Sequence, residues 1–349
     1  MKQSLYHTYK RFRTLQTGVI SAMPILILMP HSACNCRCLM CDIWKGNHDS
    51  KQLLKEDMKA LIEAMHQLGT KQVVLSGGEA LIHPDIFVFC ALMKQQGLHI
   101  TLLTTGLTLK RHAIQVVEWV DDVIVSLDGD EALHNATRNI SNAYGKLSEG
   151  INAIRTLSPG YKISGRCVIQ RSNFMIWSKI IDTAKSLSLT SISFLPADVS
   201  SEAFNRTTPW ENARQQEVLI PFELLGKLQY IIKQLVVEHQ EDFASGFILE
   251  NKDKIKAIGT YYEALHGLSD FPEKNCNAPW VSAVVEANGD VRPCFFHKPL
   301  GNIRSDHLTT ILNSRQGRDF RRTLDTMKNE TCKRCVCSLS LPAFKNPVA

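Results

Sequence analysis

Four cysteines near the N-terminus, Cys34, Cys36, Cys38 and Cys41, lie within eight consecutive positions. Thiolates packed this closely repel one another and oxidise easily unless a metal takes up their charge. A disulfide between cysteines two positions apart would be strained, because the bond needs Cα atoms roughly 5.5 Å apart. The first, third and fourth cysteines form a C-x3-C-x2-C triplet, and three ligands around a four-iron cube leave one iron open. The spacing favours a catalytic iron–sulfur cluster over a zinc site or a chance group of cysteines.

A second group of cysteines lies near the C-terminus: Cys276, Cys294, Cys332, Cys335 and Cys337. Asn288-Gly289, between the apolar segments 281–286 and 291–296, predicts a tight β-hairpin. Two thiolates from the hairpin region and two from the C-x2-C pair are enough to close a tetrahedral site. Zinc would accept these ligands as readily as an iron–sulfur cluster would. Cys337 is either a substitute ligand or no ligand at all.

The elements that must position these residues alternate between short apolar strands and amphipathic helices. Strands are expected at 25–29, 72–75, 98–103, 122–127, 162–169 and 190–195. Helical periodicity lies between them, at 53–65, 85–96, 108–118, 144–157 and 174–187. This spacing suits parallel strands joined by right-handed crossovers, with ligand sites at the carboxyl ends of the strands. The predicted fold class is α/β, with six units where a complete barrel has eight.

Polar residues follow three of these strands. Gly77, Gly78 and Glu79 come after the second strand, where the glycines would let the backbone approach a ligand and the carboxylate could bind an ammonium group. Thr105 follows the third strand and Ser126 the fourth. Taken alone, the Gly-Gly-Glu tripeptide would more often be an ordinary turn.

Together, the cysteine triplet and the Gly-Gly-Glu motif about forty residues later resemble the radical S-adenosylmethionine (SAM) superfamily. The resemblance implies a partial (β/α)6 TIM-like barrel and a [4Fe-4S] cluster on Cys34, Cys38 and Cys41, with Cys36 left out. It also implies that SAM chelates the open iron. The residues implied to contact SAM are Gly77, Gly78, Glu79, Thr105 and Ser126. The chain departs from the family where Ala80 replaces a usual proline and Thr105 a usual asparagine, and no residue is assigned a catalytic acid or base role.

Downstream of Ser126, His134 and Arg138 echo a family pattern, but a solvated helix face would explain them equally well. Residues 198–275 have no counterpart in the resemblance. Their polar start is read as a linker, with a substrate-facing role as the alternative.

The spacing of Cys276, Gly289 and Cys294 resembles the SPASM and twitch domains, which bind auxiliary clusters after radical SAM barrels. The resemblance implies a second [4Fe-4S] cluster held by Cys276, Cys294, Cys332 and Cys335, in the shorter twitch form. The expected domains are an N-terminal extension (1–24), the barrel (25–197), a helical bridge (198–275) and a small α+β auxiliary domain (276–349).

The composition of the chain argues against some classes of binding partner. The chain has 349 residues, 44% of them hydrophobic, and a net charge of +6. No Lys/Arg run argues for nucleic acid, and the apolar run at 19–29 is too short to span a membrane. Eleven cysteines in groups do not resemble a disulfide framework, so a reducing compartment, the cytoplasm, is expected.

The activity implied by the resemblance is reductive cleavage of SAM to a 5′-deoxyadenosyl radical, which takes a hydrogen atom from a substrate. An electron donor of the flavodoxin or ferredoxin type would supply the electron, and the auxiliary cluster would transfer one. A small molecule of carbohydrate type is the favoured substrate, because only about thirty residues precede the cluster loop. The alternatives are a maturase of ribosomal peptides and, with less support, a protein that binds zinc or clusters without catalysis.

Overall fold

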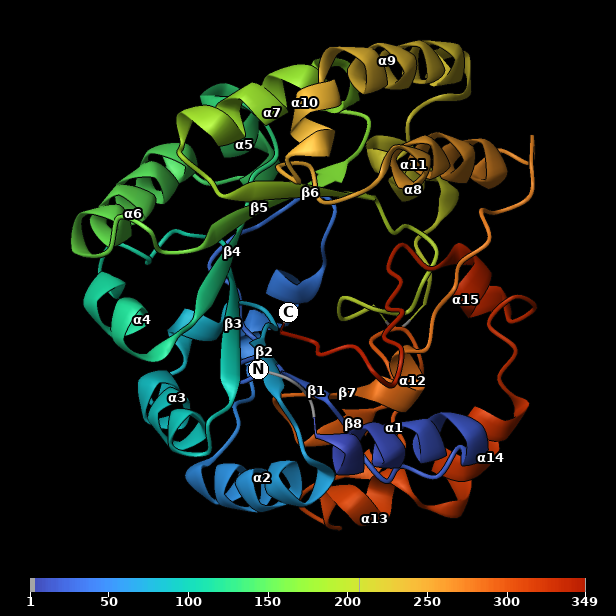
Figure 1. Ribbon diagram of the computed structural model, residues 1–349. Helices are drawn as coiled ribbons and strands as arrows, with labels where there is room; N and C mark the ends of the chain where they lie inside the picture. The colour runs from blue at the N-terminus through green and yellow to red at the C-terminus, as the bar shows by residue number, and fades with distance from the viewer. Residues whose placement is uncertain (1–3, 207, 349) are drawn as a thin grey trace.

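The computed structural model describes residues 4–206 and 208–348. One curved sheet runs through the molecule in the strand order β6-β5-β4-β3-β2-β1-β7-β8-β9 (Figure 1). Its strands are β1 (Ile25–Leu28), β2 (Gln72–Leu75), β3 (His99–Thr104), β4 (Asp122–Ser126), β5 (Ile163–Ile169), β6 (Ser191–Pro196), β7 (Ser282–Val285), β8 (Asp290–Arg292) and β9 (Gly301–Asn302). The first six strands pair in parallel, which confirms the predicted partial barrel.

Helices cover the outer face of the six parallel strands. They are α2 (Lys55–Leu68), α3 (Ile86–Gln95), α4 (Ala113–Trp119), α5 (Glu131–Arg138), α6 (Ala143–Leu157) and α7 (Trp177–Ser186). Along β4, Val123 and Val125 are fully buried while Ile124 and Ser126 are only half-buried. Since side chains alternate across a strand, the half-buried set faces the interior of the barrel. The polar residues at the strand ends therefore surround one space.

The segment after β6 is largely helical and closes one edge of the sheet. It contains α8 (Asn212–Val218), α9 (Leu225–Glu238), α10 (Gln240–Ala244) and α11 (Lys252–Leu265). Between α10 and α11 the chain runs alongside β6, where Ile192 donates to the carbonyl of Phe247 at 2.7 Å and Leu249 donates to Ile192 at 3.0 Å. This short contact covers the backbone at the open edge of β6.

The C-terminal region continues the barrel sheet. The predicted hairpin is formed by β7 and β8, where Val285 pairs with Val291. On its other side β7 pairs in parallel with β1, so the hairpin lies directly beside the strand that leads to the first cysteines. The remaining helices are α1 (Leu5–Thr17), α12 (Ala278–Val281), α13 (Leu308–Leu312), α14 (Arg315–Thr323) and α15 (Glu330–Arg334), with short 3-10 turns η1 (Ile43–Asp49), η2 (Ala80–Ile82), η3 (Phe174–Ile176) and η4 (Phe222–Leu224).

Within the described residues, no helix has the length and apolarity needed to cross a membrane.

Candidate functional site

The first cysteine group occupies a loop directly after β1, at the carboxyl edge of the sheet. Cys36 and Cys38 are buried, and Cys34 and Cys41 are partly exposed. The backbone N–H of Cys36 points at the Cys34 sulfur at 3.5 Å. A hydrogen bond from the Cys36 thiol, helped by the nearby Arg138 guanidinium, lowers the pKa of Cys38 to about 7. Burial raises the pKa of Cys41 to about 12, and the Cys38 thiolate adds to that rise. The thiols are thus close enough to influence one another's ionisation.

Gly77 and Gly78 pack against the backbone of this cysteine loop. Gly77 has a φ of +113°, and a Cβ there would lie 2.8 Å from the His31 carbonyl oxygen. A Cβ on Gly78 would lie only 2.1 Å from the Ala33 carbonyl oxygen. Glu79 donates its N–H to that same oxygen at 2.9 Å. The glycines therefore allow the turn to lie directly against the cysteine loop, a neighbour that the sequence did not specify.

The Glu79 carboxylate is buried in the interior of the barrel mouth. It accepts hydrogen bonds from the Thr104 hydroxyl at 2.9 Å, from the Thr105 N–H at 2.7 Å and from the Thr105 hydroxyl at 2.7 Å. Burial raises its pKa despite these bonds, and no cationic side chain of the described residues forms an ion pair with it. A buried carboxylate without a counter-charge is suited to binding a cationic ligand group.

Thr105 supports this carboxylate and also reaches the cysteine loop, where its hydroxyl lies 3.0 Å from the Asn35 side-chain oxygen. The Asn35 amide nitrogen is buried and has no hydrogen-bond partner among the described residues. Ser126 ends β4 on the interior face, one strand further along. Glu79, Thr105 and Ser126 therefore lie on three neighbouring strand ends around one space.

Helix α5 contributes an ion pair that the sequence did not identify. Arg138 is 8% exposed and Asp128 is 0% exposed, so the hypothesis of a solvated helix face is wrong for this helix. The Arg138 guanidinium donates to Asp128 at 2.6 Å and lies 3.5 Å from the Cys38 sulfur. The Arg138 carbonyl also accepts the N–H of Arg37 at 3.0 Å. The helix therefore fixes the cysteine loop and places a positive charge beside it.

The segment that follows β6 packs on the cysteine loop from the other side. The Trp210 indole N–H donates to Asp42, the residue after Cys41, at 2.5 Å. Arg206 stacks on the Trp210 ring at 4.0 Å and pairs with Asp198 at 2.9 Å. These contacts do not fit a simple linker, because they place the start of the bridge against the site.

The second cysteine group surrounds one small cavity. All five thiols from Cys276 to Cys337 line it, together with Lys274 and His297. The Lys274 ammonium donates to the carbonyl of Lys333 at 2.9 Å and to that of Cys335, and His297 lies 3.4 Å from the Cys332 sulfur. Nowhere in residues 4–206 and 208–348 do three His, Cys, Asp or Glu side chains converge on the position of a single metal ion.

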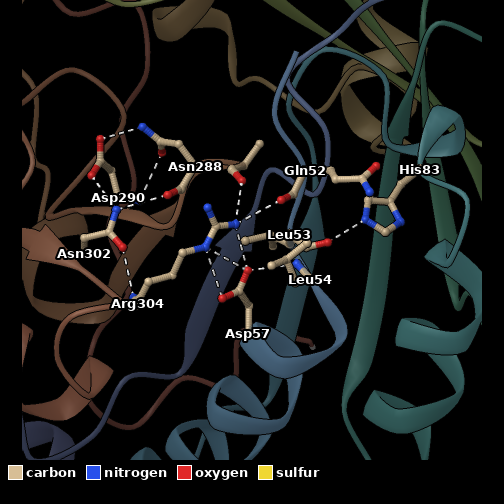
Figure 2. A network of polar contacts seen from close by, with 10 residues as sticks. Gln52, Leu53, Leu54, Asp57, His83, Asn288, Asp290, Asn302 and Arg304 are labelled. Carbon is tan, nitrogen blue, oxygen red and sulfur yellow. Dashed lines mark hydrogen bonds and ion pairs between the residues drawn. The ribbon is translucent and has the colours of Figure 1, made fainter. Parts of the chain in front are cut away.

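A polar network joins the C-terminal module to the residues at the start of α2, as Figure 2 shows. Arg304 binds the Asp57 carboxylate at 2.9 Å and the Gln52 carbonyl at 3.0 Å. The next residue, Leu53, donates to the Pro30 carbonyl at 2.9 Å, and its own carbonyl lies 2.8 Å from His83. The loop that carries the first cysteines is therefore held in part by the C-terminal module.

Two family matches fit this geometry. Residues 28–168 match the Radical SAM superfamily, and residues 276–336 match an iron–sulfur cluster-binding domain, SPASM. The chain is an enzyme with a radical SAM domain and a SPASM-type C-terminal domain, and [4Fe-4S] clusters and SAM are its cofactors.

Individual relatives are more distant. An AdoMet-dependent heme synthase of Methanosarcina barkeri is 25% identical over 80% of this chain and 79% of its own length. The subtilosin biosynthesis protein AlbA of Bacillus subtilis is 21% identical over 80% of this chain, which spans 57% of AlbA. The structure of Streptococcus suis SuiB bound to its precursor peptide SuiA superimposes with a TM-score of 0.64, covering 94% of this chain and 74% of SuiB at 14% identity. That likeness establishes the fold.

The residues present fit the radical SAM cofactors. The C-x3-C-x2-C thiols would hold a cluster at the carboxyl edge of the sheet, and Glu79 offers the SAM ammonium group a buried carboxylate. The assignments of Gly77, Gly78, Thr105 and Ser126 to SAM stay predictions.

Replacing Glu79 with glutamine should weaken SAM binding by about ten- to a hundredfold, because a charge-assisted hydrogen bond contributes roughly 1.5–3 kcal/mol. The measurement is SAM affinity of the anaerobically reconstituted protein, with cluster absorbance as the check on loading. Glu149→Gln is the matched control, since this exposed carboxylate pairs only with Lys110. Equal SAM affinity in the wild type and Glu79→Gln would leave the Gly-Gly-Glu motif as a structural turn.

Proposed function

We propose that this radical SAM enzyme modifies a peptide substrate by hydrogen-atom abstraction. When bound, the reduced cluster and SAM would supply the 5′-deoxyadenosyl radical that takes the hydrogen atom. The protein contributes the position of SAM and the exclusion of water. One observation supports the SAM-dependent part of this proposal. The Glu79 carboxylate is buried next to the cysteine loop and has no cationic partner among the described residues.

In this proposal Glu79 binds the SAM ammonium group, held in place by the hydroxyl groups of Thr104 and Thr105. Ser126 ends β4, and the Arg138 guanidinium lies beside the Cys38 sulfur. A hydroxyl and a guanidinium can each donate to a carboxylate, such as that of SAM. The Asp128 partner keeps the Arg138 side chain ordered before any ligand arrives.

The peptide part of the proposal is supported by the relatives. SuiB was solved with its precursor peptide, and AlbA serves the biosynthesis of a bacteriocin. These names favour a peptide over the carbohydrate-type small molecule expected from the sequence. The surface offers room for an extended ligand, because cavities of about 540 and 460 Å³ flank the segment after β6 and share Glu202.

A second candidate is a tetrapyrrole substrate. It is favoured by the match to the heme synthase, which covers 79% of that protein, whereas the match to AlbA covers 57% of AlbA. The two candidates share the same radical chemistry and differ only in the substrate.

For the C-terminal module we propose a second [4Fe-4S] cluster on Cys276, Cys294, Cys332 and Cys335. Four protein ligands would leave no open iron for a substrate, so electron transfer is the proposed role. The Lys274 ammonium, half-buried beside these thiols, would offset part of the negative charge of such a cluster.

Anaerobic reconstitution tests both clusters, and about eight iron and eight sulfide per chain are expected. About four iron with zinc in the remainder would contradict the second cluster alone. The loaded enzyme should then release 5′-deoxyadenosine from SAM with a reductant, and failure to do so would contradict the radical SAM activity.

The substrate is tested by comparing how synthetic peptides and iron coproporphyrin stimulate 5′-deoxyadenosine formation. Stimulation by a peptide, with a mass change in that peptide, supports the proposal. Stimulation and conversion of the porphyrin alone would replace it with the second candidate.

A further inference from the structure

Arg166 is the arginine that β5 places inside the barrel. In the sheet register it stands beside Ser126 of β4 on one side and Ser193 of β6 on the other. Residues paired in this way point to the same face of a sheet. Since Ser126 faces the interior, the guanidinium of Arg166 does too.

The hydrogen bonding of this guanidinium is incomplete. An arginine has five N–H donors, and among the described residues Arg166 uses one side-chain donor, from its Nε to the Ser193 hydroxyl at 3.2 Å. It forms no ion pair with any described carboxylate. The Ser193 hydroxyl donates in turn to the Gly165 carbonyl at 3.3 Å, so it accepts from Arg166 and is held in that orientation.

The buried arginines elsewhere in the described chain differ from Arg166. Arg138 pairs with Asp128, and Arg206 pairs with Asp198. Arg11 and Arg321 each donate to two backbone carbonyls. Arg166 is half-buried, and it has neither a paired carboxylate nor a second side-chain hydrogen bond among the described residues. A half-buried guanidinium that faces the interior of the barrel with unused N–H donors is available to an anionic group of a ligand.

The Arg166 guanidinium lies within electrostatic range of Cys337 in the C-terminal module. Towards the amino end of the strands, a hydroxyl pair of Ser164 and Ser191 at 2.8 Å closes the layer beneath Arg166. The nearest interacting carboxylate, Glu250, is instead bound by the Phe194 N–H at 3.1 Å.

We infer that Arg166 and Ser193 form an anion subsite in the barrel that binds a carboxylate group of the substrate. A guanidinium fork matches a carboxylate through two parallel hydrogen bonds. A substrate that must lie beside SAM and also reach the auxiliary domain would pass this position. The carboxylate could belong to an acidic residue of a peptide or to a propionate of a tetrapyrrole, and the inference rests on the proposed function for its substrate classes.

The test uses the reconstituted, SAM-loaded enzyme and two pairs of probes under anaerobic calorimetry. The peptide pair is acetyl-Gly-Glu-Gly-amide and acetyl-Gly-Gln-Gly-amide. The porphyrin pair is mesoporphyrin IX and its dimethyl ester. In at least one pair the wild type should bind the carboxylate member roughly ten- to a hundredfold more tightly. Arg166→Gln should reduce that preference to less than twofold, and Arg166→Lys should restore part of it.

Arg171→Gln is the matched control, because this exposed arginine follows the same strand and its loss changes the net charge equally. It should keep the full preference of the wild type. The pair that shows the preference identifies the source of the carboxylate.

Three results would overturn the inference. In the first, the wild type shows no preference for the carboxylate member of either pair. In the second, the Arg166→Gln variant loses affinity for SAM. In the third, the Arg166→Gln variant loses iron from the auxiliary domain. The second would make Arg166 a SAM contact, and the third would make it a counter-charge of the cluster. Formation of 5′-deoxyadenosine by the same wild-type preparation is measured alongside. Its failure would contradict the proposed function, whereas a missing preference in an active enzyme would contradict only the subsite.

Discussion

The Cys38→Ser variant should lose reductive SAM cleavage completely, whereas Cys36→Ser should keep most of it. In the C-x3-C-x2-C spacing, Cys38 is the central ligand and Cys36 falls within the first gap. The structure adds a role for Cys36, since its backbone N–H points at the Cys34 sulfur and its buried thiol can hydrogen-bond to the Cys38 sulfur. A serine keeps the same N–H and can donate one hydrogen bond from its hydroxyl, so this substitution should be mild.

The measurement is 5′-deoxyadenosine formed from SAM with dithionite, together with iron content and cluster absorbance. Cys90→Ser is a control for the general effect of changing a buried cysteine, because Cys90 lies on α3 away from either group. Equal loss of activity in the Cys36 and Cys38 variants, with Cys90→Ser active, would mean that the ligand register is wrong.

Much of the fold could be predicted from the sequence, because each parallel strand is a short apolar run. The runs alternate with segments of helical periodicity, so the place of each run in the pattern is unambiguous. β2 was predicted at Gln72–Leu75 and lies there, and the other five strands of the barrel differ by one or two residues. The Asn288-Gly289 pair likewise predicted the hairpin of β7 and β8. Signals of this kind depend only on residues that are close in the sequence, so they can be recognised without a structure.

The burial of polar residues on helix α5 was not predicted, and the reason is physical. The sequence of α5, Glu131–Arg138, is polar, and its buried residues include His134, Thr137 and Arg138. Burial of these groups depends on Asp128 and the cysteine loop, which lie elsewhere in the chain. A polar helix is expected to face solvent unless such partners are known.

Only part of the candidate site could be predicted from the sequence, for the same reason. Glu79 could be chosen from its motif, but its bonds to Thr104 and Thr105 required the register of β3 against β2. Arg166 carried no motif at all, and only the pairing of β5 with β4 and β6 places it inside the barrel. The sequence therefore identified the residues of the cofactor motifs better than those that could select a substrate.

A double variant, Cys294→Ala with Cys335→Ala, should separate SAM cleavage from substrate conversion. The two residues line the small cavity of the C-terminal module, and neither contacts the Glu79 carboxylate. The variant should still form 5′-deoxyadenosine with a reductant. It should fail to form product, because a substrate radical that must lose an electron would have no acceptor.

Product is measured by mass change of the substrate identified for the wild type, and 5′-deoxyadenosine is quantified in the same reaction. Folding needs a separate control, since removal of a metal site that joins the hairpin to the C-terminal loop can unfold a small module. Thermal unfolding and SAM affinity provide it, because β7 pairs with β1, the strand that leads to the first cysteines. Cys337→Ala is the matched variant, and it should convert substrate normally if Cys337 is no ligand. Normal product formation by a folded double variant would show that the second cluster is structural, and the electron of the substrate radical would then have to leave by another route.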